Sequence, residues 1–549
     1  MNDTRPRRAS GARRSGRARA ALGALAGVIA AFCALCVGEL VAAVVRPEAG
    51  PVTAVGSAVV DRTPPAVKEF AVRNFGTDDK LVLRLGILVL LALFALAVGV
   101  LALRHRRVGA SAVLVFGLVG AVAAVGRPEG VPADALPSVV GAVVAAGVLY
   151  LLAGRLAPAP VPSPAAGETA AGDGAPGDGA PRGGAAGFDR RGFVIAATAA
   201  AAASAGAGYA GRRLAASVQA GASASRAEIT LPVVGSPAPA VPSGTDLGVR
   251  GVSSYFTPNG SFYRVDTALV VPRVDAGRWR LRIHGKGVTR PLTLGYHDLL
   301  RRPTVERDIT LACVSNEVGG PYIGNARWVG VRLADLLREA GVKAPSEGGP
   351  ADQLVSRSVD GMTLGTPVET VLDGRDAMLA LGMNGEPLPF EHGFPVRMLV
   401  PGLYGYVSAC KWIEEIELTT FDAYDAYWVK RSWAPEAPIK TESRIDTPRP
   451  FASPKPGTVP VGGVAWAQHR GISRVEVRVD GGDWHTARLG AEDGRDTWRQ
   501  WVWEWPATSG HHTLEVRATD GTGATQTADR TGTVPDGATG WHSVVVDVS

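Results

Sequence analysis

A single cysteine in the second half of this chain has the surroundings of a metal ligand. Cys313 ends an apolar, strand-like run that starts at Asp308, and the glycine pair at 319–320 follows it after a short stretch. Only one other cysteine, Cys410, lies outside the strongly apolar N-terminal region. A thiolate suits a soft or borderline metal far better than a carboxylate does. The pattern therefore favours one metal held by one sulfur atom of the protein.

Basic side chains downstream of Cys313 could hold an anionic organic ligand beside such a metal. His392 and Arg397 belong to a His-Gly-Phe-Pro-Val-Arg segment, and Lys411 belongs to a Ser-Ala-Cys-Lys-Trp segment that begins at Ser408. Imidazole, guanidinium and ammonium groups all donate to phosphate oxygens. These residues thus favour a soft metal together with an anionic organic cofactor.

Taken together, these segments resemble the sulfite oxidase family of molybdopterin enzymes. The resemblance covers roughly residues 246–549, and several separate motifs occur in the order that the family has. It implies that Cys313 ligates molybdenum and that the cofactor is molybdenum-molybdopterin. It also implies a two-electron reaction in which the cofactor passes an oxygen atom between water and a small-molecule oxide or oxyanion.

The resemblance extends to residues around the cofactor and the substrate. Arg264 matches an arginine that lines the family's anion pocket, although Val265 stands where asparagine is usual and a plain surface charge is the alternative. Asp360 aligns loosely with an aspartate that contacts the pterin, and a turn aspartate before Gly361 is the other interpretation. The implied catalytic residues are Cys313, Arg264 and Trp433, and the implied cofactor-binding residues are Phe262, Tyr263, Arg264, Asp360, His392, Arg397, Ser408 and Lys411.

Two departures from the family bear on the substrate. Sulfite-oxidising members carry an arginine pair shortly after the cysteine, whereas here Asn316 is followed by Glu317 and Val318, so that Glu317 adds negative charge where a dianion would approach. Trp433 takes the position of the family's active-site tyrosine, and an indole cannot pass a proton as a phenol can. We therefore expect an S-oxide or related small oxide as substrate. The alternatives are a sulfite dehydrogenase and a non-catalytic, membrane-anchored receptor or adhesin that retains the fold.

The charge of the chain is concentrated at its N-terminus. The formal net charge of the 549 residues is +6, and the first 20 residues alone contain seven arginines and one aspartate, so the remainder balances to zero. Such a balance argues against a nucleic-acid-binding surface. The arginine-rich tail instead predicts the cytoplasmic end of a membrane anchor.

Five apolar stretches have close to the ~20 residues that a membrane-spanning helix needs. With the arginine tail and the basic segment 104–107 inside, the odd number of crossings places everything after residue 211 outside the cytoplasm. We therefore expect a multi-pass protein of the cell membrane with an extracytoplasmic catalytic domain. The stretches cover residues 20–45, 81–103, 108–125, 136–153 and 192–210, and the last of them is only weakly apolar.

The N-terminal portion divides into three parts. Residues 1–156 form a four-helix transmembrane region, and residues 157–187, rich in Pro, Gly and Ala, are typical of a flexible linker. Residues 188–245 hold the fifth transmembrane segment and a further linker. The pair Arg190-Arg191 ahead of that segment is either an export signal of the twin-arginine type or an ordinary positive-inside flank.

The C-terminal portion divides into two parts, so the fold class is α+β behind N-terminal transmembrane helices. Residues 246–435 resemble a mixed α+β molybdopterin-binding domain of the sulfite oxidase type. Residues 436–549 contain alternating strands with hairpin turns and resemble the family's immunoglobulin-like dimerisation domain, a β-sandwich. A homodimer is accordingly one expectation.

The other cysteines and the histidines bear on redox partners. Cys33 and Cys36 lie in the first apolar stretch, where two small apolar side chains are a plainer interpretation than redox or metal chemistry. Cys410 is expected to be reduced and buried, with a disulfide to Cys313 as the alternative. The predicted membrane helices contain no histidine, so they lack axial ligands for haem. Electrons must then pass through a separate partner, either a cytochrome or a quinone-linked protein.

Overall fold

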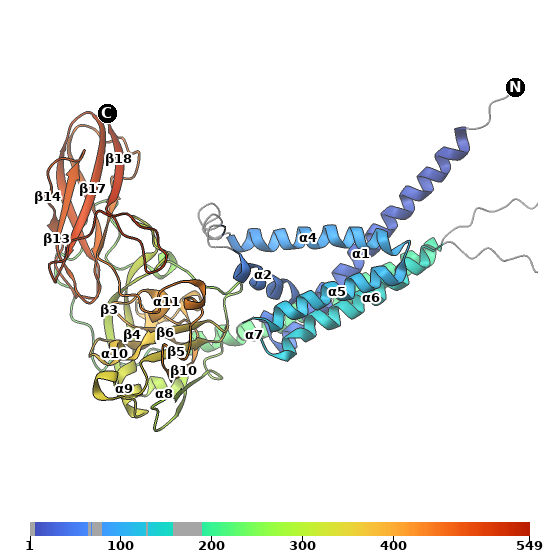
Figure 1. Ribbon diagram of the computed structural model, residues 1–549, viewed down its shortest axis with the longest axis horizontal. Coiled ribbons are helices and arrows are strands. Elements are labelled where there is room, and N and C mark those ends of the chain that lie inside the picture. The colour runs from blue at the N-terminus through green and yellow to red at the C-terminus, as the bar shows by residue number, and fades with distance from the viewer. Residues whose placement is uncertain (1–5, 64–66, 68–78, 128–129, 158–188) are drawn as a thin grey trace, which may run out of the picture. The chain divides into compact units, whose positions relative to one another are not determined.

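The chain forms two compact units in the computed structural model, Met1–Val218 and Gln219–Ser549. The structure describes residues 6–63, 67, 79–127, 130–157 and 189–549 (Figure 1). Apart from Ala157, the linker expected at 157–187 lies outside the described residues.

The first unit is helical, and five helices among its described residues are long and apolar enough to cross a membrane. The first four predicted apolar stretches match four of them within a few residues, whereas the fifth covers only the first half of its helix. This fifth helix has the lowest mean hydropathy, 1.4 against 2.2 or more for the others. The long helix α7 reaches beyond the predicted stretch and ends in the second unit. The helices are α1 (Pro6–Val45), α2 (Pro51–Arg62), α4 (Asp79–Ala102), α5 (Arg106–Val125), α6 (Leu136–Arg155) and α7 (Arg190–Glu228), with short 3-10 turns η1 (Pro47–Ala49) and η3 (Pro132–Ala135).

Glycines allow α1 and α4 to cross at close range. A Cβ atom at Gly27 would collide with the backbone carbonyl of Ala95, and one at Gly99 would collide with that of Gly23. Small residues spaced four apart on each helix are a common means of helix association in membranes. Gly23 of α1 contacts Gly99 and Leu103 of α4, whereas Gly27, one turn later in α1, contacts Ala95 and Gly99. The two helices are therefore antiparallel.

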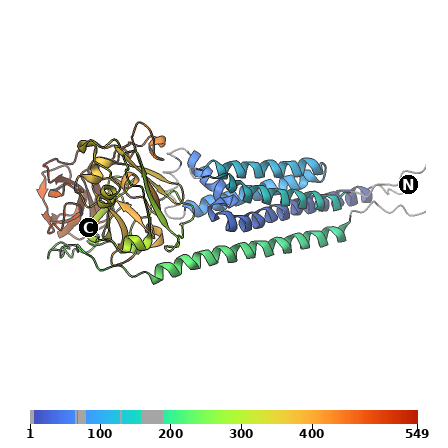
Figure 2. The same ribbon diagram turned by 90° about the horizontal axis from the view of Figure 1, so that it is seen from below.

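Contacts along α7 show that it runs parallel to α1. The thiol of Cys33 lies 3.8 Å from the carbonyl oxygen of Ala200, and further along both helices Leu40 packs against Gly211. Figure 2 shows α7 extending alongside the other helices of this unit. If α1 and α7 both cross a membrane, they cross it in the same direction.

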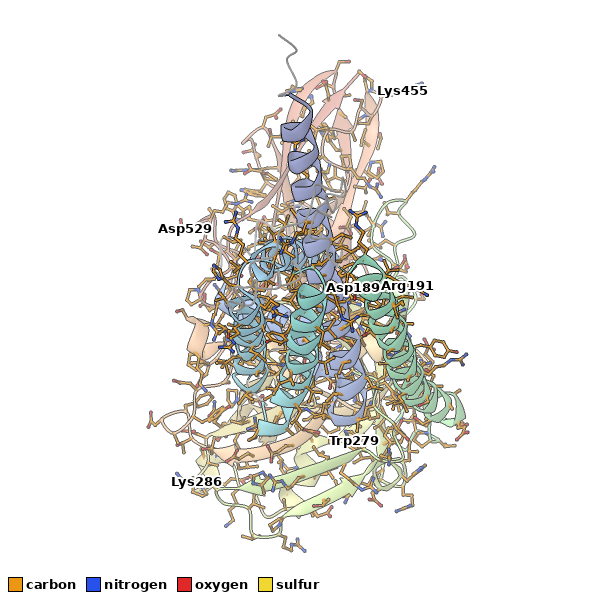
Figure 3. All side chains as sticks on the ribbon, turned by 90° about the vertical axis from the view of Figure 1, so that its right-hand side faces the viewer. Asp189, Arg191, Trp279, Lys286, Lys455 and Asp529 are labelled. Atoms are coloured by element: carbon orange, nitrogen blue, oxygen red, sulfur yellow. The ribbon has the colours of Figure 1, made fainter. Side chains whose placement is uncertain are left out.

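Two ion pairs lie at the ends of these helices. Arg46, after α1, pairs with Asp134, before α6, at 2.5 Å. At the opposite ends, Arg155 of α6 pairs with Asp189 at 3.2 Å. Figure 3 shows Asp189 and Arg191 where α7 begins. Charged residues also lie within the helices, Glu39 in α1 and Arg212 and Arg213 in α7, and such residues are rare in a hydrocarbon environment.

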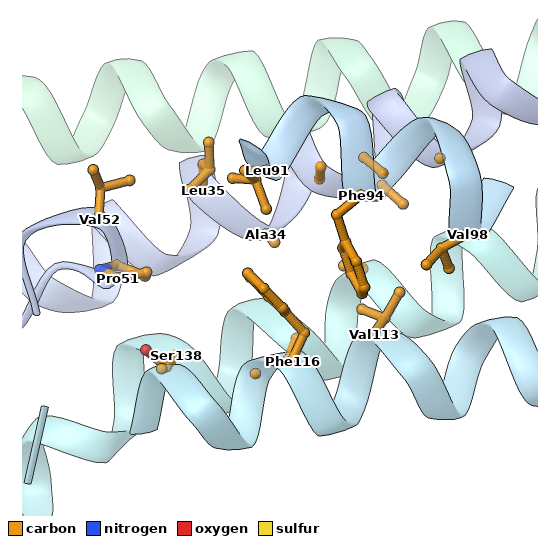
Figure 4. A pocket seen from close by; sticks show the side chains of 18 of the residues that line it. Ala34, Leu35, Pro51, Val52, Leu91, Phe94, Val98, Val113, Phe116 and Ser138 are labelled. Atoms are coloured by element: carbon orange, nitrogen blue, oxygen red, sulfur yellow. The ribbon is translucent and has the colours of Figure 1, made fainter. Parts of the chain in front are cut away.

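An apolar cavity of about 100 Å³ lies among α1, α2, α4, α5 and α6 (Figure 4). Phe94 and Phe116 stack at its wall with their ring centroids 4.6 Å apart. Ser138 contributes a hydroxyl that has no hydrogen-bond partner among the described residues. The lining of the cavity is otherwise apolar.

One mixed and one antiparallel sheet form the first part of the second unit. One has the order β2-β1-β10-β5-β6, in which β1 (Arg280–Gly285) runs parallel to β10 (Ile413–Thr419). The other has the order β3-β4-β7-β8, with β9 paired to β7, and its strand β3 (Thr304–Ala312) ends directly before Cys313. The other elements are β2 (Leu292–Gly295), α8 (Tyr296–Leu300), β4 (Ile323–Arg332), α9 (Leu333–Glu339), β5 (Gln353–Ser358), β6 (Thr363–Pro367), α10 (Val368–Leu372), β7 (Met378–Met383), β8 (Glu386–Pro387), β9 (Arg397–Leu399) and α11 (Gly405–Ser408), with short 3-10 turns at Asn259–Ser261, Pro345–Glu347, Phe390–His392 and Val429–Arg431.

Two four-stranded antiparallel sheets, β11-β12-β16-β15 and β14-β13-β17-β18, make up the C-terminal part. They share a core in which Val461, Val475, Trp501 and Val546 are fully buried, which explains the alternating apolar residues of these strands. The immunoglobulin-like character of this part and its role in dimerisation stay predictions. The strands are β11 (Glu442–Thr447), β12 (Gly457–Trp466), β13 (Ile472–Val479), β14 (His485–Thr486), β15 (Arg488–Leu489), β16 (Arg499–Ala507), β17 (Gly510–Asp520) and β18 (His542–Val548).

The glycine crossing predicts a position-specific loss of stability. Gly99→Leu should destabilise the helical unit by about 1–3 kcal/mol, because the new side chain has no space against α1. The measurement is thermal unfolding of the full chain in detergent, followed through the helical circular dichroism signal. Gly86→Leu, also on α4, is the matched control, since a Cβ there meets no described atom within 4 Å. Equal melting curves for the two variants would contradict the crossing.

Candidate functional site

A pocket of about 130 Å³ opens beside Cys313 in the second unit. Strand β3 delivers the cysteine to its wall, and the segment that contains α11 supplies the opposite side. The fold thus brings together segments that lie more than a hundred residues apart in the chain. Six of the predicted site residues line the pocket: Tyr263, Cys313, Asp360, Arg397, Lys411 and Trp433.

The thiol of Cys313 is held by its own loop. The backbone amide of Cys313 donates to the carbonyl of Tyr322 at 2.9 Å, and the amide of Ser315 donates to the sulfur at 3.4 Å. The side chain of Asn316 accepts from the amide of Tyr322 at 2.7 Å, which closes the loop. Burial raises the pKa of the Cys313 thiol, while the Ser315 amide acts against that rise. A cation in contact with the sulfur would favour the thiolate that a metal ligand needs.

Arg397 brings a buried cation to the pocket wall. It is 6% exposed, its Nη1 donates to the carbonyl of His392 at 3.5 Å, and its guanidinium lies over the ring of Trp328. Its Nε has no hydrogen-bond partner among the described residues. Burial lowers the pKa of this guanidinium from its ordinary value. A buried cation with an unused donor is costly unless an anion binds to it.

Lys411 supplies the second cation of the pocket, and a carboxylate balances it. Its ammonium lies 2.9 Å from Asp266 and donates to the carbonyl of Glu391 at 3.3 Å. The side chain of Asp266 is almost completely buried. The charged side chains that line the pocket are Asp266, Asp360, Arg397 and Lys411, so the formal charge of its wall is zero.

These donors fit a metal that is carried by an organic anion. In the described ranges, no group of three or more His, Cys, Asp or Glu side chains is placed to hold a metal ion. A metal beside Cys313 would therefore take one thiolate from the chain and its other ligands from a bound molecule. The unpartnered donor of Arg397 and the ammonium of Lys411 are suited to the anionic portion of such a molecule.

Aromatic side chains form the remaining wall of the pocket. Trp433 packs against Tyr406 and Trp428, with ring centroids 5.6 Å and 6.2 Å away. The hydroxyl of Tyr406 donates to the carbonyl of Ala434 at 2.7 Å, which ties α11 to the segment that carries Trp433. Burial raises the pKa values of Tyr406 and Tyr263, so both phenols stay protonated at neutral pH.

Four predicted residues are not among those that line the pocket. Phe262 packs edge-on against Trp328 and His392. His392 donates from Nε2 to the carbonyl of Asn259 at 2.9 Å, and its burial, with Arg397 nearby, lowers its pKa to about 4, so it is neutral. Its backbone carbonyl meets Arg397, so the structure gives it a supporting position.

The other two lie at the rim and behind the wall. Arg264 is partly exposed, with its Nε 3.6 Å from Asp266. The hydroxyl of Ser408 is buried and donates to the carbonyls of Leu403 and Tyr404, both at 3.0 Å, so it stabilises α11. Neither side chain touches the cavity in this structure.

The carboxylate of Glu317 is not part of the pocket wall. The turn after Cys313 leaves Glu317 exposed and outside the pocket lining. The carboxylate that balances the pocket is Asp266, which sequence analysis missed. Its position two residues after Arg264, in an otherwise apolar stretch, was the available signal.

Two further lining residues, Tyr406 and Trp428, were also missed. Tyr406 places a second phenol in the pocket, besides that of Tyr263. Cys410 lines the pocket too, and both it and Cys313 are free thiols. Burial raises the pKa of Cys410 to about 12, which keeps that thiol protonated.

Comparison with known proteins gives matches over this part of the chain. Residues 268–428 match the family described as oxidoreductase molybdopterin binding domain. Mitochondrial sulfite oxidase of Homo sapiens is 30% identical over 304 residues, which are 48% of this chain and 55% of that protein. The uncharacterized oxidoreductase YuiH of Bacillus subtilis (strain 168) is 32% identical over 159 residues, which are 29% of this chain and 74% of that protein.

A solved structure also matches. The sulfane dehydrogenase SoxCD from Paracoccus pantotrophus has a TM-score of 0.47 and 26% identity, over 54% of this chain and 84% of that chain. The chain spans about half the length of the mitochondrial sulfite oxidases that it matches.

The unused donor of Arg397 yields a prediction about cofactor content. Arg397→Met keeps the apolar bulk against Trp328 but removes the cation, so the pterin content of the purified protein should fall about tenfold or more. Pterin is measured by fluorescence after oxidation and release from the protein. The control is Arg307→Met on β3, which breaks an ion pair with Asp376 away from the pocket. Unchanged pterin in Arg397→Met would exclude an anchoring role for this side chain.

Proposed function

Because the chain belongs to the sulfite oxidase family of molybdopterin-dependent oxidoreductases, we propose that it is a membrane-anchored, extracytoplasmic oxidoreductase. In this proposal it catalyses two-electron oxygen-atom transfer on a small sulfur-containing oxide. The observation that carries the proposal is the pocket that joins the Cys313 thiol to the buried, partly unsatisfied cation of Arg397. Electrons pass through a separate partner, a cytochrome or a quinone-linked protein.

The residues of the chain bind and orient the reactants. Cys313 supplies the protein's thiolate to molybdenum, and Arg397 and Lys411 bind the anionic part of the pterin. When bound, the molybdenum cofactor supplies the two-electron exchange and the oxygen-atom transfer itself. The phenols of Tyr263 and Tyr406 hold protons in the wall of the pocket at neutral pH.

The pocket wall favours a substrate with little net charge. Its four charged side chains sum to zero, and Lys411 is already balanced by Asp266. Trp428, Trp433 and Tyr406 offer an apolar, aromatic surface that suits an organic group attached to the oxide. These features support an S-oxide over the sulfite dianion.

Sulfite oxidation is the second candidate, and the names of the sulfite oxidases among the relatives favour it. A sulfur oxyanion would need a cation that is not already committed to the cofactor, and Arg264, whose sequence neighbours Tyr263 and Val265 line the pocket, is one candidate. A non-catalytic receptor is less consistent with a buried cation that lacks a hydrogen-bond partner, because an anchor without cofactor gains nothing from its cost.

The anchor and its topology belong to the same proposal. The parallel contacts of α1 and α7 are consistent with five crossings, which put the N-terminus and the second unit on opposite sides of the membrane. The arginines near the N-terminus and between α4 and α5 favour the cytoplasm for their side. Arg190-Arg191, in the first turn of α7, remain candidates for an export signal or for a positive-inside flank.

Cys313→Ser tests the assignment of the metal ligand. A hydroxyl is a poor ligand for a soft metal, so the variant should retain most of its pterin while oxygen-atom transfer falls at least about a hundredfold. Pterin, molybdenum and the turnover of sulfite and of a sulfoxide are measured on the same preparations. Cys410→Ser makes the same chemical change at the other thiol of the pocket and should keep most of the activity. Full activity in Cys313→Ser would refute the proposed function, and turnover of sulfite alone would favour the second candidate.

Topology is tested by cysteine labelling of intact cells. Phe451→Cys lies on the second unit at a position that is 81% exposed, so a membrane-impermeant maleimide should label it. His105→Cys, in the exposed turn between α4 and α5, should be labelled only after the cells are opened. The unsubstituted chain gives the background from its own four cysteines. Labelling with the opposite pattern would reverse the proposed orientation.

A further inference from the structure

The C-terminal sheets reach the strand that leads to Cys313 through the loops between their own strands. Thr310 of β3 lies three residues before the cysteine. Its amide donates to the carbonyl of Asp496 at 2.9 Å, and its hydroxyl accepts from the amide of Trp498 at 2.7 Å. The side chain of Gln468 donates to the carbonyl of Thr310 at 3.0 Å. The backbone amide, the backbone carbonyl and the hydroxyl of Thr310 are thus each hydrogen-bonded to the C-terminal part of the chain.

The same sheets contact the loop that follows Cys313. Arg444 of β11 donates from Nη1 to the carbonyl of Gly320 at 2.8 Å. The imidazole of His542, at the start of β18, covers Gly319, where a Cβ atom would collide with the ring. Gly319 has a positive φ of 80°, so this position requires glycine for two separate reasons. Contacts on both sides of Cys313 thus come from residues after position 440.

Arg444 and His542, which together form a clamp on the loop after Cys313, are themselves held by hydrogen bonds. Arg444 also donates to Asp446 at 2.7 Å and to Ser253 at 3.0 Å, and only 11% of its side chain is exposed. His542 accepts from the amide of Ile445 at its Nδ1, at 3.0 Å. Burial lowers the pKa of His542 to about 4, so the ring is neutral at physiological pH. Each of the two side chains is therefore held by at least one hydrogen bond besides its contact with the loop.

We propose that the C-terminal sheets position the metal ligand, with Arg444 and His542 as positioning residues that fix the loop 314–322 and hence the sulfur of Cys313. This inference rests on the proposed function for the identity of the ligand. Neither side chain lines the pocket. They act through the loop, whose glycine pair would otherwise leave the segment after the cysteine free to move.

Positioning of this kind has a chemical consequence. A metal–thiolate bond has a preferred length and direction, and the amide of Ser315 that bonds to the sulfur belongs to the clamped loop. If the loop moves, the sulfur can still bind metal but its orientation varies from molecule to molecule. Displacements on the order of 1 Å at a catalytic centre cost about a hundredfold in rate.

The test compares two arginines of the same part of the chain. Arg444→Met removes the clamp, whereas Arg470→Met removes a comparable set of bonds that does not reach the loop: Arg470 donates to Asp520 at 2.8 Å, to the carbonyl of Ile439 at 2.9 Å and to Thr441 at 3.2 Å. Hydrogen exchange of the peptide covering residues 313–322 is measured on the full chain without cofactor. We expect this peptide to exchange about tenfold faster in Arg444→Met and at the normal rate in Arg470→Met. Equal rates in the two variants would overturn the proposal.

The loaded protein gives a second readout. In Arg444→Met, the electron paramagnetic resonance spectrum of the metal should broaden or split, and kcat should fall about tenfold with KM within about twofold of normal. Arg470→Met should change neither. His542→Asn keeps an acceptor for the amide of Ile445 and removes the ring over Gly319, and it decides the matter if Arg444→Met does not fold. An unaltered loop exchange rate in His542→Asn would then overturn the proposal.

These outcomes separate the inference from the proposed function. Faster loop exchange is read without cofactor, so it stands even if the protein acts on another substrate. Loss of activity in Cys313→Ser together with normal loop exchange in Arg444→Met would support Cys313 as the metal ligand. The same result would refute the proposed positioning role of Arg444.

Discussion

The site depends on holding one sulfur atom still at the end of a strand. Strand β3 is fixed in its sheet, but its last residue is followed by a loop that makes a sharp turn before β4. The hydrogen bonds from Cys313 to Tyr322 and from Ser315 to the sulfur define the turn. A flexible thiol would bind a metal in many geometries, whereas a fixed one presents a single direction for the bond. The packing of the second unit serves this constraint from several sides.

Electrostatics set the second condition. Arg397 is buried with an unsatisfied donor, which is tolerable only where an anion completes its coordination. Lys411 is different, because Asp266 already balances it within the wall. The pocket therefore has one cation, Arg397, that favours binding of an anion, and the rest of its wall is neutral overall and largely aromatic. An anionic cofactor binds to that cation and leaves a weakly charged space for a substrate.

Sequence analysis reached the parts of the site that lie in short local motifs. Cys313 with its glycines, Arg397 and Lys411 each stand in a segment whose spacing can be recognised without the fold. Tyr406 and Trp428 could not be found in this way, because their roles depend on which side of a helix or extended segment faces the cavity. The exposure of Glu317 could not be predicted for the same reason, since the direction of a turn decides whether its side chain points inward. The dependence of the cysteine loop on Arg444 and His542 is a tertiary fact with no local signal at all.

The membrane helices were easier to predict, because length and hydropathy define them without reference to partners. The parallel arrangement of α1 and α7 required the structure, since only paired contacts along both helices reveal their relative direction.

The location of His542 on β18 has a further consequence for the synthesis of the chain. A chain that has been synthesised as far as Trp433 already contains Cys313 and all the residues that line the pocket. It still lacks β11 and β18, whose side chains contact the loop after the cysteine. The loop after Cys313 therefore gains its contacts from Arg444 and His542 only after translation has passed position 542.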